Sequence, residues 1–186
     1  LNAHYKRLGW NARAQEGAVD GWYQTKFTLK EEPLVSILIP NKDHTDDLDV
    51  CLNSFFERAD YQNYEFIIIE NNSVLPETFA YYEKIEKEHD NVKVVYWEAG
   101  FNYSAINNFG FKFAKGDYIM LLNNDVELIT PDIFQSMLGF CMRPEVGIVG
   151  AKLLYNDHTV QHAGVLVGAG GLADHVFKGI HEDDPG

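Results

Sequence analysis

An apolar strand in the second half of the chain leads directly into a cluster of oxygen-bearing side chains. Residues 118–122 read Tyr-Ile-Met-Leu-Leu, and Asn123, Asn124 and Asp125 follow at once. Side chains two residues apart in an extended strand point to the same side, so Asn123 and Asp125 are predicted to face one ligand together. Amide and carboxylate oxygens suit Mg²⁺ and Mn²⁺, usually beside substrate phosphates and water. Because such a motif is more commonly a polar turn, its surroundings must decide.

Three further polar clusters each follow an apolar run. They lie at 41–43, 70–73 and 100–102. The carboxyl ends of parallel strands share one edge of a sheet, and α/β proteins bind their ligands there. Loops can be polar merely because water solvates them. Four such clusters at one edge nevertheless favour a binding site.

Composition restricts the partners of this site. The 28 acidic and 15 basic residues give a net charge of −13, which argues against nucleic acid, because a phosphate backbone requires a basic surface. A phosphate-bearing ligand would need a local cation, a bound metal or a helix N-terminus to offset the repulsion. Cys51 and Cys141 fall in apolar helical patterns and are predicted to be buried thiols. No apolar run approaches the ~18 residues of a membrane-spanning helix.

The elements that must position the clusters alternate between strand and helix. Apolar runs predict strands over 34–39, 66–69, 92–97, 118–122 and 146–149. Amphipathic helices are predicted after a cap at Asp43 or Thr45, from Pro76 to about His89, from Ser104 to Ala114, and from Pro131 onward. Pro40 is expected to end the first strand. The alternation predicts an α/β fold, a doubly wound and mostly parallel sheet flanked by helices.

The two ends of the chain are expected to differ from this core. Residues 1–33 are predicted to be an extension or linker, and residues 34–186 the ligand-binding portion. A hairpin is predicted within 153–167, followed by a glycine-rich loop at 168–171. Because the chain opens with Leu1 rather than Met, it is expected to be a piece of a longer protein.

Four motifs in register resemble the family 2 glycosyltransferases of the GT-A fold. They lie at 33–40 (PLVSILIP), 65–73 (EFIIIENNS), 107–118 (NNFG with AKGDY) and 121–127 (LLNNDVE). Residues 150–154 and 161–165 are similar to the bacterial rhamnosyltransferase-like branch of that family. The resemblance runs from about Pro33 to Gly186, and its specificity comes from the shared order and spacing of the motifs.

The resemblance implies an inverting glycosyltransferase that moves a hexosyl or rhamnosyl group. The donor would be a nucleoside diphosphate sugar, and the acceptor a glycan or a lipid-linked molecule in bacterial surface polysaccharide synthesis. A divalent metal, Mn²⁺ or Mg²⁺, would assist. The implied location is the cytoplasm or the inner face of the membrane.

The resemblance also assigns residues to the site. Nucleotide-sugar binding is expected from Pro40, Asn41, Lys42, Glu70, Asn71, Asn108, Asn123 and Asn124. The Asp-x-Asp metal motif of the family corresponds to Asn123-x-Asp125, in which an amide replaces one carboxylate, and His175 is a further candidate ligand. For His162 a structural role is the favoured interpretation. The family usually carries two aspartates where this chain has Glu70 and Asn71, which leaves the nucleobase open.

Two alternatives stay open. The general base of the family follows a later motif and is expected beyond Gly186, so a non-catalytic nucleotide-sugar-binding module is one alternative. The other is a sugar nucleotidyltransferase. That enzyme would favour a glycine-rich, basic loop after the first strand, whereas residues 40–43 contain no glycine.

Overall fold

The structure is a computed structural model that describes residues 1–17, 19–168 and 171–184. It divides into two compact units, Glu31–Asp132 and a second unit that combines Leu1–Lys30 with Ile133–Gly186. The predicted division into an extension and a nucleotide-sugar portion stays a prediction. In the described ranges, every helix is too short or too polar to span a bilayer.

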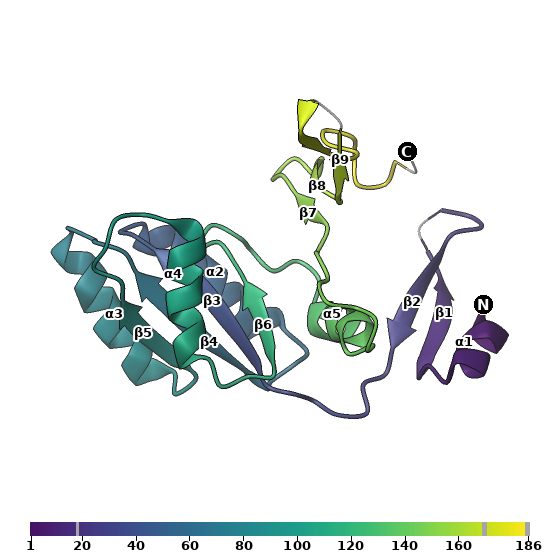
Figure 1. The fold of residues 1–186 in the computed structure, drawn as a ribbon, viewed down its shortest axis with the longest axis horizontal. Helices are drawn as coiled ribbons and strands as arrows, with labels where there is room; N and C mark the ends of the chain where they lie inside the picture. Colours follow the sequence, from purple (N-terminus) through teal and green to yellow (C-terminus); the bar gives the residue numbers. More distant parts are fainter. Residues whose placement is uncertain (18, 169–170, 185–186) are drawn as a thin grey trace. The chain divides into compact units, whose positions relative to one another are not determined.

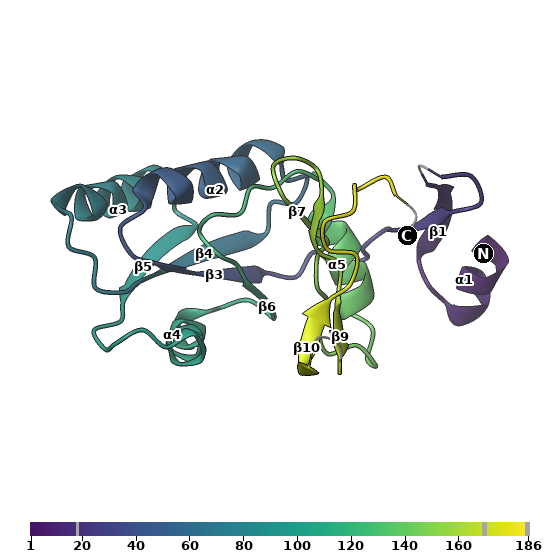
Figure 2. The ribbon, with the colours of Figure 1, turned by 90° about the horizontal axis from the view of Figure 1, so that it is seen from above.

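The first unit contains a four-stranded parallel sheet with the strand order β5-β4-β3-β6 (Figure 1). The strands are β3 (Val35–Asn41), β4 (Tyr64–Glu70), β5 (Val92–Tyr96) and β6 (Tyr118–Leu121). The helices are α2 (Thr45–Arg58), α3 (Pro76–Glu88) and α4 (Tyr103–Gly110), with a 3₁₀ turn at Phe111–Phe113. Figure 2 shows α2 and α3 on one face of the sheet and α4 on the other.

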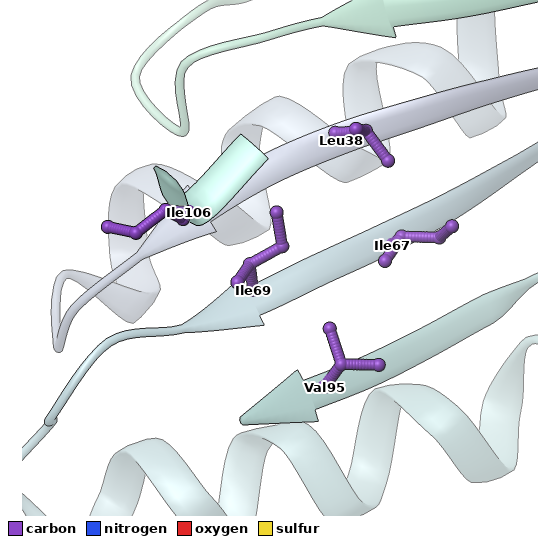
Figure 3. Packing of buried hydrophobic residues seen from close by; sticks show 5 residues of the cluster. All are labelled: Leu38, Ile67, Ile69, Val95 and Ile106. Atoms are coloured by element: carbon purple, nitrogen blue, oxygen red, sulfur yellow. The ribbon is translucent and has the colours of Figure 1, made fainter. Parts of the chain in front are cut away.

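The central strands read as continuous apolar runs because helices cover both of their faces. One core cluster combines three strands and α4, and Figure 3 shows its buried members Leu38, Ile67, Ile69, Val95 and Ile106. Gly110 of α4 lies so close to β4 that a Cβ there would come 2.3 Å from Cδ1 of Ile69. The α4 backbone therefore packs almost directly onto the sheet.

Pro40 does not end its strand, contrary to the prediction. β3 continues to Asn41, and Pro40 and Asn41 pair with Ile69 and Glu70. The carbonyl of Leu38 accepts a hydrogen bond from the N–H of Leu122, so the backbone groups of Leu38 point toward β6. The backbone nitrogen of Pro40, two residues later, points the same way, but the pairing of β3 with β6 has already ended at Leu121. Its missing N–H therefore leaves no ladder hydrogen bond unmade, and the strand tolerates it.

Two other predictions are wrong. Residues 146–149 do not form a strand in any described sheet, and Ile148 is 91% exposed, because an apolar run without a partner edge cannot make a ladder. Neither Asp43 nor Thr45 caps α2: His44 is its N-cap, in a left-handed conformation and without a side-chain capping bond. The helix expected from Pro131 begins at Ile133.

The second unit is built from short elements. They are α1 (Asn2–Leu8), β1 (Ala12–Glu16), β2 (Tyr23–Phe27), α5 (Ile133–Cys141), β7 (Leu153–Leu154), β8 (Val160–His162), β9 (Val165–Val167) and β10 (Ala173–His175). Three antiparallel pairs result, β1 with β2, β7 with β8, and β9 with β10. α5 packs on β2 through Phe140 and Phe27, whose ring centroids are 4.7 Å apart.

The predicted C-terminal hairpin is two hairpins. Gly164, at φ 122°, separates β8 from β9, a conformation that favours glycine. Residues 169–170 of the predicted loop lie outside the described residues. Both cysteines are free: Cys51 is buried, as predicted, and Cys141 is half-buried.

Candidate functional site

Hydrogen bonds join the loops that follow all four parallel strands. The amide nitrogen of Asn124, after β6, donates to Oδ1 of Asn41 at the end of β3 over 2.6 Å. The backbone N–H of Asn71, after β4, donates to the carbonyl of Asn41. The side chains of Asn71 and Asn72 both donate to the carbonyl of Ala99, after β5. The structure thus brings the four polar clusters to one edge of the sheet.

A buried tyrosine lies between two of these loops. Tyr82, on α3, accepts a hydrogen bond from Nδ2 of Asn41 and donates one to Oε2 of Glu70, each over 2.8 Å. Burial, and after it the hydrogen bond to Glu70, raises the pKa of Tyr82 well above the usual range, although the hydrogen bond from Asn41 acts in the opposite direction. The hydroxyl therefore keeps its proton, and its direction of donation toward Glu70 is set. Tyr82 belongs to no motif of the sequence, and sequence reasoning missed it.

The carboxylate of Glu70 is hydrogen-bonded to other residues of the chain. Its carboxylate accepts from the backbone N–H and the hydroxyl of Ser73, in addition to Tyr82. Ser73 in turn accepts from the backbone N–H of Asp43, after β3. Glu70 and Asn71 were predicted to contact a nucleotide; both are buried, and Glu70 shapes the loop from within.

Asp43 caps the start of α3 instead of α2. Its Oδ1 accepts hydrogen bonds from the backbone N–H groups of Val74 and Leu75 and from the hydroxyl of Thr78. Desolvation raises the pKa of Asp43, but the hydrogen bonds from Leu75, Val74 and Thr78 together outweigh it and leave the pKa below its ordinary value of 3.8. The loop after β3 is thereby anchored to the helix that follows β4.

Replacing Asp43 with alanine is expected to destabilise the protein in a pH-dependent way. Because the folded-state pKa is depressed, the stabilisation is full above pH 3.8 and is lost as the pH falls through the lower folded value. Urea unfolding of both proteins at pH 7 and at pH 3 checks this, with the exposed Asp90→Ala as a control. A difference that is the same at both pH values would contradict the capping role.

The predicted metal motif lies beyond the end of β6, where Asn124 and Asp125 form a turn and not an extended strand. Asn123 and Asp125 are exposed, whereas Asn124 between them is half-buried and turns toward Asn41. In the described parts of the chain, no group of three or more His, Cys, Asp or Glu side chains is arranged to hold a metal. The motif therefore offers one carboxylate and one amide oxygen, a donor set that fits a hard cation only when a ligand or water completes the coordination.

Helix α2 supports this loop from below. The thiol of Cys51 lies 3.9 Å from the carbonyl of Asn123, and burial raises its pKa to about 12, which makes it a packing group rather than a nucleophile. The hydroxyl of Ser54 accepts from the N–H of Leu128, and Arg58 donates to the Leu128 carbonyl. Ser54 and Arg58 lie one helical turn apart on α2, and this spacing of two polar residues could have indicated a contact with a neighbouring loop.

The remaining predicted residues lie on different elements. Pro40 is half-buried in β3, Lys42 is exposed beside the buried Asn41, and Asn108 is exposed on α4. His175 belongs to the other compact unit, where its Nδ1 lies 2.8 Å from Nδ1 of His162.

Residues 36–166, more than half of the chain, match the sequence profile of Glycosyl transferase family 2. The chain belongs to glycosyl transferase family 2. The matched region contains nearly all of the parallel sheet and the loops at its carboxyl edge, so the predicted family is confirmed.

Two curated relatives of this family 2 domain are much longer. Protein y4gI of Sinorhizobium fredii is 40% identical over 89% of this chain and 18% of its own length. The O-antigen biosynthesis protein RfbC of Myxococcus xanthus is 39% identical over 98% of this chain and 14% of its own length. The chain thus spans less than a fifth of either relative.

A solved structure resembles the fold. The mannosyltransferase PcManGT from Pyrobaculum calidifontis, in complex with GDP-Man and Mn²⁺, matches with a TM-score of 0.57 and 16% identity, over 63% of this chain and 35% of that chain. At this identity the likeness shows the fold alone. It confirms the predicted α/β class, a parallel sheet flanked by helices.

Proposed function

We propose that this chain is the donor-binding portion of an inverting glycosyltransferase that acts in bacterial surface polysaccharide synthesis. Membership of family 2 supports sugar transfer from a nucleoside diphosphate sugar. The relative named for O-antigen biosynthesis supports a role in polysaccharide synthesis, and membership of the rhamnosyltransferase-like branch stays part of the proposal. The observation that carries the proposal is the joining of four polar loops at one sheet edge, with Asn123 and Asp125 exposed there.

Asn123 and Asp125 are the residues that would hold a divalent cation in this proposal. When bound, Mn²⁺ or Mg²⁺ would neutralise charge on the departing diphosphate. A bound cation would also offset the repulsion between a diphosphate and a chain whose net charge is −13. The protein's own contribution is to present one exposed amide and one exposed carboxylate on a loop that α2 contacts through Cys51, Ser54 and Arg58. His175 stays a proposed further ligand.

A thermal-shift screen tests the proposal. UDP-, dTDP- and GDP-sugars are added to the chain with and without Mn²⁺. One nucleotide class is expected to raise the melting temperature much more with Mn²⁺, since ligand at 100 times Kd stabilises by about 2.7 kcal/mol. The matching nucleoside, which lacks the diphosphate, serves as the control. No shift with any donor, or a bound structure with the nucleotide away from this sheet edge, would contradict it.

A non-catalytic donor-binding module is the second candidate, and Asn123 favours it. An amide in place of a carboxylate lowers the affinity for the divalent cation that sugar transfer would use. Metal-dependent hydrolysis of the donor by the longer protein would separate the two, because a mere binding module leaves the donor intact. For a nucleotidyltransferase, the loop after β3 remains unsuitable, since it has no glycine and Asn41 is buried.

A further inference from the structure

A chain of side-chain hydrogen bonds runs beneath the candidate site. Asn124 donates to Asn41 over 2.6 Å, Asn41 donates to Tyr82 over 2.8 Å, and Tyr82 donates to Glu70 over 2.8 Å. We refer to these four residues as the relay. It connects the loop after β6, the end of β3, the helix α3 and the end of β4.

The direction of every bond in the relay is set. Glu70 only accepts from its neighbours, so Tyr82 must donate to it and accept from the NH₂ group of Asn41. The amide oxygen of Asn41 is then left to face Asn124. A rotation of the Asn41 amide would place its NH₂ group against the NH₂ group of Asn124, so the arrangement has one orientation.

The relay is more than loop packing because three of its four residues are buried and their polar atoms are paired, while Asn124 is half-buried. Asn41 and Glu70 are 3% exposed and Tyr82 is 1% exposed. Among the described residues, the buried side-chain polar atoms without a partner are Oδ1 of Asn107 and Oε1 of Gln135, neither of which belongs to the relay. A satisfied polar network in a low-dielectric interior is rigid, and losing one partner is costly.

We propose that the relay sets the position of the metal loop, which carries Asn123, Asn124 and Asp125, relative to the loop after β4. Asn41, Asn124 and Tyr82 are then positioning residues, not contacts to the nucleotide sugar. This inference rests on the proposed function, in which Asp125 holds the metal, and on the expectation from the sequence that the loops at the ends of β3 and β4 lie against the nucleotide sugar. Asn124 is fixed inward by Asn41, and Asn123 and Asp125 on either side of it are consequently held outward.

The test measures Mn²⁺ affinity by calorimetry in the presence of UDP, dTDP or GDP, whichever binds the parent chain best. The variants are Asn124→Ala, Tyr82→Phe and the double variant. Each single change is expected to weaken Mn²⁺ binding about three- to tenfold, and the double variant no more than the larger single change, because partners in one network are non-additive. Asn53→Ala is the control, because it removes a hydrogen bond that the Asn53 side-chain amide donates to Asp49 within α2, away from the relay.

Tyr82→Phe is the decisive variant. The Tyr82 hydroxyl hydrogen-bonds Asn41 and Glu70 and also interacts with Ser73, and its connection to Asn124 runs through Asn41. A lowered melting temperature with unchanged Mn²⁺ affinity, or strictly additive effects in the double variant, would overturn the inference and leave a structural role. Failure of the parent chain to bind Mn²⁺ with any nucleotide would instead reject the proposed function, and the inference with it.

Discussion

Asp125→Ala is expected to weaken Mn²⁺ binding about 100-fold in the presence of a nucleoside diphosphate, because the number of charged ligands tunes hard-cation affinity over several orders of magnitude. Asp125 is the one carboxylate of the Asn123-x-Asp125 pair. The diphosphate supplies the other negative charge in the proposed site. Metal should therefore bind weakly to the parent chain alone and much better with nucleotide, and the alanine variant should lose that coupling.

Two companion variants sharpen this expectation. Asn123→Asp restores a second carboxylate and is expected to strengthen Mn²⁺ binding without nucleotide. Asp117→Ala removes the same charge just before β6, at the opposite end of that strand, and is expected to change nothing. Calorimetry of Mn²⁺, with and without UDP or dTDP, measures all three. An Asp125→Ala protein that binds metal and nucleotide like its parent would make the motif an ordinary polar turn.

Gly116→Ala is expected to cause a large loss of stability, about 3 kcal/mol, because overpacking against immovable atoms is among the costly core changes. A Cβ at Gly116 would lie 2.5 Å from the carbonyl oxygen of Leu34 and 2.7 Å from the backbone nitrogen of Ser36. Residues 35 and 36 are already paired with β4 on one side and β6 on the other. The backbone cannot retreat without breaking the sheet.

The close approach also allows a part-buried polar contact. The N–H of Gly116 donates to the hydroxyl of Ser36 over 2.8 Å, and that hydroxyl donates to Glu65. Chemical denaturation followed by circular dichroism measures the free energy of unfolding. Gly100→Ala, in the same unit and with open space around its Cβ position, is the matched control and should change it little. Equal stability of the two variants would show that the contact at Gly116 relaxes cheaply.

The parallel sheet was predictable because its signal is local. Ile37, Leu38 and Ile39 form a run that is buried on both faces, and such a run reads the same in any context. The alternation with amphipathic helices then places the polar clusters at one edge. Residues 146–149 carry the same local signal and form no strand in the described sheets. A strand also requires a partner edge, and a hydrophobic run does not predict whether one is available.

Capping and internal pairing were not predictable in this way. Asp43 stands two residues before α2, where a sequence rule assigns it as a cap, yet it caps α3, which begins more than thirty residues later. Its partner is chosen by the parallel pairing of β3 and β4, which brings the two strand ends together. The same pairing turns Glu70 toward Ser73 and Tyr82 instead of toward solvent.

By itself, the sequence determined which residue types reach the carboxyl edge, since alternation within a strand and the order of strands and helices follow from local patterns. That sufficed for the family, whereas the exposure of Asn123 and Asp125 arises in a turn beyond the end of β6 and not from strand alternation. Only the tertiary structure decided which polar side chains form hydrogen bonds with one another. Asn41, Asn124 and Tyr82 come from distant segments, and a hydrogen bond depends on a separation of about 3 Å between atoms that no sequence spacing encodes.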